Sequence, residues 1–328
     1  MDILKQIKKQ KIIGLAPMAG YTDSPFRQLC KEYGADLVYT EMISALGLIY
    51  EQKSKKKDRK LKSLELSKFE ELERPIFVQI FGREPKMMAE AAKIIINEFN
   101  PDGIDINMGC PARKVVASFN GSSLMREPKL AGEIVKEVRN AIGDKILSVK
   151  TRLGWDNKND IFEFAKIIEK SGADILAIHC RTKAQGFSGD VDWGIIKDLK
   201  KIITIPILIN GGVKDWKTAE KCLELSNADG ILIGQASLGK PWIFNEIKSK
   251  KDMDLSLDEV KDIVLNQINL HKGDFTELRK HLIFYFKGFK NSAKIRTAIC
   301  TCKTKEEFLN ILNTFNDDGD HHDHEDSS

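Results

Sequence analysis

Eight short apolar segments, each followed by a stretch with helical character, constrain the fold of this chain more than any other feature. The segments are rich in Ile, Val or Leu and mostly non-alternating, which is typical of parallel strands covered on both faces. They span 12–18, 36–42, 76–82, 103–109, 145–152, 175–181, 205–211 and 230–235. Intervening segments with helical periodicity include 86–99, 129–141, 161–171 and 217–226. Eight strand-then-helix units in succession predict an α/β fold, a (β/α)₈ TIM barrel.

A doubly wound open sheet is the alternative to the barrel. It would need a fingerprint such as G-x-G-x-x-G after the first strand, and the sequence has none there. With 42% hydrophobic residues, 30% charged residues and a net charge of +4, the composition is that of a globular protein with a substantial core. The length of 328 residues fits one large barrel with a small appendage or several ordinary domains, so length does not choose between them.

The strand pattern stops near residue 245, and the sequence beyond it is helical in composition. Segments 256–259 (Ser-Leu-Asp-Glu) and 304–307 (Thr-Lys-Glu-Glu) both match a capping box. We therefore predict a barrel domain over 1–245, a small C-terminal helical bundle over 246–316 and an acidic disordered tail over 317–328. The bundle core is predicted to include Leu278, Ile283, Phe284, Phe286 and Ile295. The tail's mixture of His and Asp offers a divalent metal no fixed geometry, so no metal site is predicted.

The six cysteines have no metal-ligand spacing, and no apolar N-terminal segment resembles a signal peptide or a membrane span. A reduced cytoplasmic setting without a membrane is expected. Cys110 differs from the other cysteines because Gly109 precedes it and Pro111 follows it. A constrained turn of this kind suits a thiol presented to a substrate better than one that fills a core.

Side chains at the C-terminal ends of barrel strands face the active site, so these positions are the candidate site. The candidates are Pro17, Met18, Ala19, Gln79, Asn107, Cys110, Lys150, Arg152, His179, Arg181, Asn210, Gly211, Gly212, Gly234 and Gln235. Glycines after the seventh and eighth strands allow backbone N–H groups to approach an anion, which predicts a phosphorylated ligand. Lys150 and His179 can donate to a carbonyl or an anionic ring nitrogen, and Gln79 can pair with the edge of a heterocycle. Taken alone, His179 would more often be an ordinary buried histidine.

Three separated motifs resemble the tRNA-dihydrouridine synthase family. They are Ala16-Pro-Met-Ala-Gly-Tyr-Thr-Asp-Ser-Pro-Phe-Arg27, Asp105-Ile-Asn-Met-Gly-Cys-Pro-Ala-Arg-Lys-Val115 and Gly239-Lys-Pro-Trp-Ile-Phe244. They occur in the family's order, the resemblance runs from about residue 10 to 315, and the bacterial branch matches best. The resemblance implies an FMN-containing barrel that reduces uridines in tRNA, with NADPH (or NADH) regenerating the reduced flavin.

The resemblance also implies roles by matched position. Pro17, Met18 and Ala19 would line the flavin, Gln79, Lys150 and His179 would contact its rings, and the positions that would hold its phosphate end are Asn210, Gly211, Gly212, Gly234 and Gln235. Asn107 and Arg152 would contact the target uracil, and Cys110 would be the proton donor. Two positions depart from the pattern, since family members often have Asp at Gly212 and Arg at Gln235. The Gln removes a charge-assisted bond to phosphate, so weaker flavin retention is expected unless another cation substitutes.

The chemistry of uracil independently requires such a donor. Its C5=C6 bond is conjugated to the C4 carbonyl, so hydride adds at C6 and a proton must reach C5. An ordinary thiol is mostly protonated at neutral pH and can act as that general acid. A nearby Lys or Arg would favour the thiolate, so Cys110 is expected to keep some distance from Lys150.

Basic residues point to an RNA partner. The segment from Lys272 to Lys305 contains nine Lys or Arg residues and only two acidic residues. A stripe that contacts phosphates is predicted from Arg279, Lys280, Lys287, Lys290, Lys294 and Arg296. Segment 53–62 holds seven basic residues and one acid. The alternatives are a barrel that oxidises or reduces a free pyrimidine and an RNA-binding protein without redox chemistry. No obligate protein partner is evident, and a monomer is expected.

Overall fold

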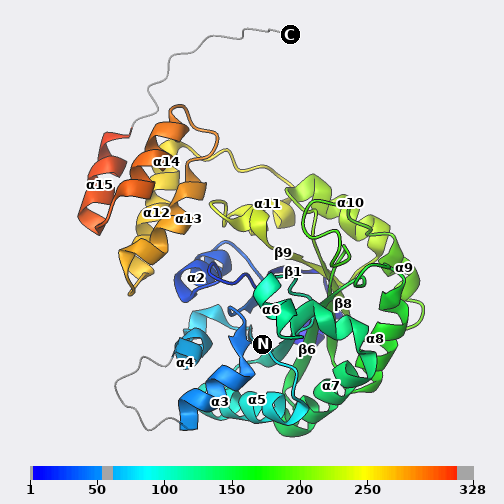
Figure 1. Cartoon of the computed structure of the whole chain (residues 1–328). Helices are drawn as coiled ribbons and strands as arrows, with labels where there is room; N and C mark the ends of the chain where they lie inside the picture. The colour runs from blue at the N-terminus through cyan, green and yellow to red at the C-terminus, as the bar shows by residue number, and fades with distance from the viewer. Residues whose placement is uncertain (1–2, 54–61, 316–328) are drawn as a thin grey trace. The chain divides into compact units, whose positions relative to one another are not determined.

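The structure is a computed structural model that describes residues 3–53 and 62–315 (Figure 1). The chain divides into two compact units. The first comprises the described residues up to Ser237 together with Pro241–Asp252, and the second comprises Leu238–Lys240 and the described residues from Met253 onward. The predicted boundary at residue 245 falls inside a helix of the first unit, α11 (Ile243–Ser249).

The first unit contains the predicted barrel. Its strands are β1 (Ile12–Leu15), β2 (Val38–Tyr39), β3 (Ile43–Ser44), β4 (Ile76–Phe81), β5 (Gly103–Asn107), β6 (Ile146–Arg152), β7 (Ile175–His179), β8 (Ile207–Asn210) and β9 (Gly230–Ile233). All pairs are parallel, in the order β1-β9-β8-β7-β6-β5-β4-β2, with β3 also on β4. Backbone hydrogen bonds from Asp36 N to Ile13 O (2.9 Å) and from Leu15 N to Leu37 O (2.8 Å) join the two ends of this path. The TIM-barrel prediction is confirmed, and the segment predicted over 36–42 is divided between β2 and β3.

Helices surround the strands (Figure 1). They are α1 (Ile3–Ile7), α2 (Ser24–Glu32), α3 (Ala45–Lys53), α4 (Lys62–Ser67), α5 (Pro85–Phe99), α6 (Arg113–Ala117), α7 (Pro128–Ile142), α8 (Asp160–Lys170), α9 (Ile195–Leu199), α10 (Trp216–Ser226) and α11, with short 3₁₀ turns η1 (Glu71–Glu73), η2 (Gly121–Arg126) and η3 (Gln235–Ser237). Local sequence sets their ends. Helix α5 begins at Pro85. A proline is well tolerated there because the first N–H groups of a helix have no hydrogen-bond partner within it. The helix is followed by Asn100, the C-cap residue, in the left-handed region (φ 49°).

The barrel interior is apolar at one end and polar at the other. A single buried cluster joins residues from α1 and from β1, β2, β4, β7, β8 and β9, including Ile12, Tyr39, Phe77, Leu208 and Leu232. Strands on opposite sides of a barrel can contribute to one cluster only through its interior. Because side chains two residues apart on a strand share a face, Gln79 lies on the same interior face as Phe77, one layer nearer the C-terminal end. The apolar cluster therefore supports a polar layer above it.

A buried ion pair holds α2 beside the barrel. Arg27 Nε donates to Glu73 Oε2 at 2.5 Å, with side chains 2% and 0% exposed, and Arg27 also donates to the carbonyls of Thr22 and Lys68. Asp23 caps the helix by accepting from Phe26 N. The final Arg and the Asp of the first sequence motif thus have structural roles.

The second unit contains four helices among its described residues: α12 (Leu257–Leu270), α13 (Phe275–Tyr285), α14 (Ser292–Thr301) and α15 (Lys305–Thr314). Ser256 and Glu259 form the predicted capping box. The second predicted box is wrong in part: Thr304 caps α15, but the Glu307 carboxylate accepts from Lys303 N because its side chain reaches one residue further back.

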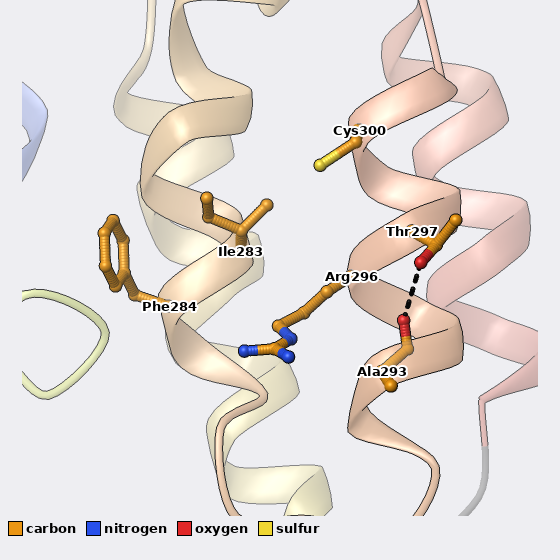
Figure 2. Close-up of a pocket in the computed structure, with 6 residues that line it drawn as sticks. All are labelled: Ile283, Phe284, Ala293, Arg296, Thr297 and Cys300. Carbon is orange, nitrogen blue, oxygen red and sulfur yellow. Dashed lines mark hydrogen bonds between the residues drawn. The ribbon is translucent and has the colours of Figure 1, made fainter.

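Leu278, Phe286 and Ile295 are buried in this unit, as predicted for its core. Ile283 and Phe284 are only partly buried. They line a pocket of about 330 Å³ with Ala293, Arg296, Thr297 and Cys300 of α14 (Figure 2). One side of α13 therefore faces this opening between the two helices rather than the core.

Candidate active site

The polar layer of the barrel interior brings together the predicted side chains of β4 to β8. Strand register pairs Gln79 with Asp105, Asn107 with Lys150, Arg152 with His179 and His179 with Asn210. Paired positions in parallel strands share a face, so all of these side chains project to the same interior side. Pro17, Met18 and Ala19 follow β1, Gly211 and Gly212 follow β8, and Gly234 and Gln235 follow β9. All the predicted site residues therefore lie at the C-terminal end of the barrel.

Cys110 lies on a turn that neighbouring groups hold in place. Asn107 Oδ1 accepts hydrogen bonds from Gly109 N (3.2 Å) and Cys110 N (2.9 Å), and Cys110 O accepts from Ser122 N (3.1 Å). Gly121 has φ 60°, and a Cβ there would lie 2.8 Å from Cys110 O. Cys110 is partly exposed, whereas the barrel's other cysteines are buried. The structure thus presents this thiol at the site.

Lys150 lies beside Asn210. Its Nζ donates to Asn210 Oδ1 (3.2 Å), whose Nδ2 in turn donates to Leu232 O (2.7 Å). Burial lowers the pKa of Lys150 to about 8, with Asp105 opposing and Arg152 adding to the shift, and Cys110 is close enough to contribute. The expectation that the thiol keeps its distance from Lys150 stays a prediction. A cation near the thiol can stabilise negative charge that forms during proton transfer.

His179 is neutral at physiological pH. Burial, reinforced by the positive charges of Lys150, Arg152 and Arg181, lowers its pKa to about 2. The side chain is 7% exposed, and its Nδ1 has no hydrogen-bond partner within the described part of the chain. A buried ring nitrogen without a partner is costly, so this atom is available to a ligand.

Consecutive glycines follow β8 and lie against aromatic and imidazole rings. Gly211 (φ 101°) and Gly212 (φ 82°) occupy the left-handed region, which side chains rarely adopt. A Cβ on Gly211 would lie 3.0 Å from His179 Nε2, and one on Gly212 would lie 2.9 Å from Trp193. Trp193 Nε1 donates to Gly211 O at 3.0 Å and fixes this turn. Glycine at position 212 thus fits both the backbone conformation and the available space.

Arg152 makes contacts that the sequence did not reveal. Its guanidinium donates to the carbonyls of Gly109 (2.9 Å), Thr182 (2.9 Å) and Gly186 (2.8 Å), and it lies over the Phe187 ring at 5.2 Å. The side chain is 2% exposed. Arg152 therefore joins the cysteine turn to the loop after β7, in addition to its predicted substrate role.

Asn107 and Gln79 are also engaged with each other. Asn107 Nδ2 donates to Gln79 Oε1 (2.8 Å), and Gln79 Nε2 donates to Asp105 Oδ2 (2.6 Å). Asp105 is fully buried and had no role among the predicted site residues. The available signal was an acid in the middle of an apolar strand, where carboxylates are rare.

The basic residues of the second unit fall into two groups. Arg279 is half-buried and donates to the carbonyls of Cys300 (3.0 Å) and Cys302 (2.8 Å), so it caps the end of α14. Lys287, Lys290, Lys294 and Arg296 are exposed. Lys280 is partly buried. The predicted basic segment 53–62 lies largely outside the described residues, and Lys53 pairs with Glu90 (3.5 Å).

Within 3–53 and 62–315, no cluster of three or more His, Cys, Asp or Glu side chains is suited to hold a metal ion. Over the same ranges, every helix is too short or too polar to cross a membrane. The His- and Asp-rich tail lies outside the described residues.

Comparison with solved structures defines the class of fold. The chain resembles an old yellow enzyme solved as "TcOYE with pHBA" (TM-score 0.54, 13% identity, covering 76% of this chain and 91% of that one). It also resembles morphinone reductase (TM-score 0.52, 11% identity, covering 75% and 87%). At these identities the likeness establishes a TIM barrel and no more.

Sequence comparison establishes the family. A family model described as dihydrouridine synthase (Dus) matches residues 14–318. The chain is 37% identical to a probable tRNA-dihydrouridine synthase of Aquifex aeolicus, covering 92% of this chain and 95% of the relative. It is 39% identical to tRNA-dihydrouridine synthase B of Vibrio parahaemolyticus, covering 89% and 90%. The chain belongs to the dihydrouridine synthase family.

Proposed function

We propose that this protein is a flavin-dependent tRNA-dihydrouridine synthase that reduces the C5=C6 bond of specific uridines in tRNA. The observation that carries the proposal is Cys110, held on a hydrogen-bonded turn at the C-terminal end of the barrel, where Lys150 contributes a positive charge. The names of the similar proteins from Aquifex aeolicus and Vibrio parahaemolyticus support the same reaction.

The residues present fit FMN. The unpartnered Nδ1 of His179 and the partly buried Lys150 ammonium suit the polar edge of a flavin ring, and Gln79 keeps one N–H free beyond its bond to Asp105. The side of the ring would rest on Pro17, Met18 and Ala19. The phosphate end would be held by the residues after β8 and β9, namely Asn210, Gly211, Gly212, Gly234 and Gln235. When bound, FMN would supply the hydride for C6 of uracil, with NADPH or NADH as its source.

Residues of the protein itself would supply the proton for C5 of the uracil and stabilise the negative charge that its transfer leaves on sulfur. Cys110 holds a proton at Sγ and delivers it to C5 of the uracil. The positive charge of Lys150, which interacts electrostatically with Cys110, would stabilise the resulting negative charge on sulfur. Neutral His179 can donate or accept one hydrogen bond without adding charge. Asn107 and Arg152 would orient the uracil while they fix the turn that carries the thiol. Uridine must leave its base stack for its face to reach such a site.

Replacement of Cys110 by Ala tests this assignment. The Cys110→Ala protein should retain FMN and oxidise NADPH, because no flavin-facing group is removed. Its rate of dihydrouridine formation should fall about 100-fold or more, the usual contribution of a general acid. Stopped-flow flavin reduction and mass spectrometry of tRNA nucleosides measure the two steps.

The matched control for that test is Cys222→Ala, which removes a buried thiol on the helix α10 instead of one at a strand end. This variant should keep synthase activity. Full dihydrouridine formation by Cys110→Ala would refute the proposed donor. A preparation that is colourless and cannot take up FMN would refute the flavin-dependent function itself.

A further inference from the structure

Asp105 occupies the far end of a hydrogen-bond chain that leads to the reactive turn. Asp105 Oδ2 accepts from Gln79 Nε2 at 2.6 Å, and Gln79 Oε1 accepts from Asn107 Nδ2 at 2.8 Å. Asn107 Oδ1 then accepts from Cys110 N at 2.9 Å and from Gly109 N at 3.2 Å. The chain therefore runs without a break from a carboxylate in the middle of β5 to the backbone of Cys110.

The direction of this chain depends on its first member. The amide groups of Gln79 and Asn107 are nearly symmetrical in shape, and each has a donor end and an acceptor end. An ionised carboxylate only accepts hydrogen bonds, so it requires the NH₂ of Gln79 to face it. The oxygen of Gln79 then faces Asn107, which in turn directs its oxygen toward the N–H of Cys110.

We propose that Asp105 is a positioning residue for Cys110, which fixes the direction of the Gln79–Asn107 hydrogen-bond chain and thereby holds the turn that carries the thiol. The importance of that turn for catalysis rests on the proposed function. The hydrogen-bond chain from Asp105 to Cys110 is a property of the fold, so it can be tested without tRNA or flavin.

The burial of Asp105 supports this role over a purely structural one. Its side chain is 0% exposed, and a buried carboxylate costs stability that an apolar residue in the same strand would not. Burial raises the pKa of Asp105 to about 6, and the Ser148 hydroxyl, the Gln79 amide and the Lys150 charge oppose the rise. These three groups favour the ionised form, in which Oδ2 accepts from Gln79 Nε2, while Oδ1 has no hydrogen-bond partner within the described residues.

The chain leaves capacity for a ligand. Gln79 Nε2 carries a second hydrogen, and Gln79 Oε1 has a second lone pair. Direction fixed by Asp105 would thus also decide which end of the Gln79 amide a bound heterocycle meets. If the Gln79 amide were inverted, its NH₂ group would face the NH₂ group of Asn107. A bound ligand would likewise meet the opposite end of the Gln79 amide.

Two substitutions at position 105 separate the effect of the hydrogen-bond direction from the effect of side-chain packing. Asp105→Leu keeps the branching at Cγ, with a larger side chain, but removes the acceptor. Asp105→Asn can still turn its oxygen toward Gln79. In the protein without flavin, amide hydrogen exchange at Cys110, followed by NMR, should become about tenfold faster in Asp105→Leu, because one hydrogen bond of ordinary strength is lost. Asp105→Asn should restore exchange to within about threefold of the wild-type rate.

Asp36→Leu is the matched control for a lost buried aspartate. Asp36 is 8% exposed and accepts from Ile13 N and Lys248 Nζ at the opposite end of the barrel strands. Its loss should destabilise the protein without a selective change at Cys110. Unchanged Cys110 exchange in Asp105→Leu, or equal acceleration in Asp105→Asn and Asp36→Leu, would overturn the proposal.

Activity measurements extend the test to the loaded enzyme. Asp105→Leu should lower the rate of dihydrouridine formation about tenfold more than it lowers NADPH oxidation, with Asp105→Asn restoring most of the difference. Equal loss in both steps would contradict a role through Cys110. A wild-type protein that makes no dihydrouridine would refute the proposed function. The amide exchange rates at Cys110 would still decide whether Asp105 holds the Cys110 turn through Gln79 and Asn107.

Discussion

His179 shows how a barrel interior sets the protonation state of a site residue. Burial and the neighbouring charges of Lys150, Arg152 and Arg181 lower its pKa to about 2 from an ordinary value of 6.5. The folded protein therefore keeps a neutral ring at pH values where the unfolded chain takes up a proton. Stability contributed by this residue is complete above pH 6.5 and is lost as the pH falls below it.

This linkage predicts acid sensitivity that depends on His179. Between pH 7 and pH 5 the free energy of unfolding should fall by about 2 kcal/mol more in the wild-type protein than in His179→Gln. Urea titrations at both pH values measure the difference. Asp105 shifts stability in the opposite direction, since burial raises its pKa, but this contribution is common to both proteins and cancels. Identical pH dependence would show that His179 is not held neutral.

Residue types at strand ends could be predicted from sequence, whereas their mutual contacts could not. Lys150 stood out because a Lys within an apolar strand is rare, whereas His179 became a candidate through its place at the end of the next strand. The register puts both side chains on the same face of the sheet. The three-carbonyl contact of Arg152 depends on how the loop after β7 returns toward the strands. Such a contact joins residues 30 or more positions apart and leaves no local pattern.

At the scale of elements, Arg152 connects the end of β6 to two neighbouring loops. Its bonds to Gly109 O on one side and to Thr182 O and Gly186 O on the other tie the cysteine turn to the loop after β7. Phe187, midway along the sequence of that loop, is 61% exposed. Loss of the guanidinium should therefore release this loop first.

Limited proteolysis measures that release. Chymotrypsin cleavage after Phe187 should be about tenfold faster in Arg152→Met, as expected when roughly 1.5 kcal/mol of hydrogen bonding is lost. Arg152→Lys should not restore resistance, because one ammonium cannot reproduce the planar fork. The matched control is Arg139→Met, since Arg139 of α7 also donates to three carbonyls, those of Gly172, Gly143 and Lys145. Equal cleavage in both methionine variants would indicate general loosening instead.

Element positions followed from the sequence more closely than element ends. The predicted helix over 86–99 is α5 (Pro85–Phe99), because Pro at the start and Asn100 at the end mark its limits. The predicted strand over 12–18 ends at Leu15, since Pro17 has no N–H to continue the ladder. The segment over 36–42 divides into β2 and β3, and nothing in its apolar pattern marks the interruption.

At the scale of the molecule, the second unit is proposed to bind tRNA through its exposed basic residues. Reversal of three charges, in Lys287→Glu/Lys294→Glu/Arg296→Glu, should weaken tRNA binding and lower the slope of log affinity against log salt concentration by about 2. The control carries the same charge change on barrel helices, in Lys166→Glu/Lys170→Glu/Lys197→Glu. Filter binding at several salt concentrations measures both. An equal change in the two triple variants would remove the second unit as the specific tRNA platform.

The assignment of Leu238–Lys240 to the second unit has a consequence for how the protein could be divided or recombined. A Cβ on Gly239 would lie 2.3 Å from the carbonyl carbon of Phe284, so this short segment packs directly on α13. The chain consequently passes from one unit to the other after Ser237, Lys240 and Asp252. A single junction, whether made by truncation or by gene fusion, would separate Gly239 from α13 and so remove the contact between them. Exchange of substrate-binding modules with another barrel would therefore have to transfer two separate pieces of sequence together.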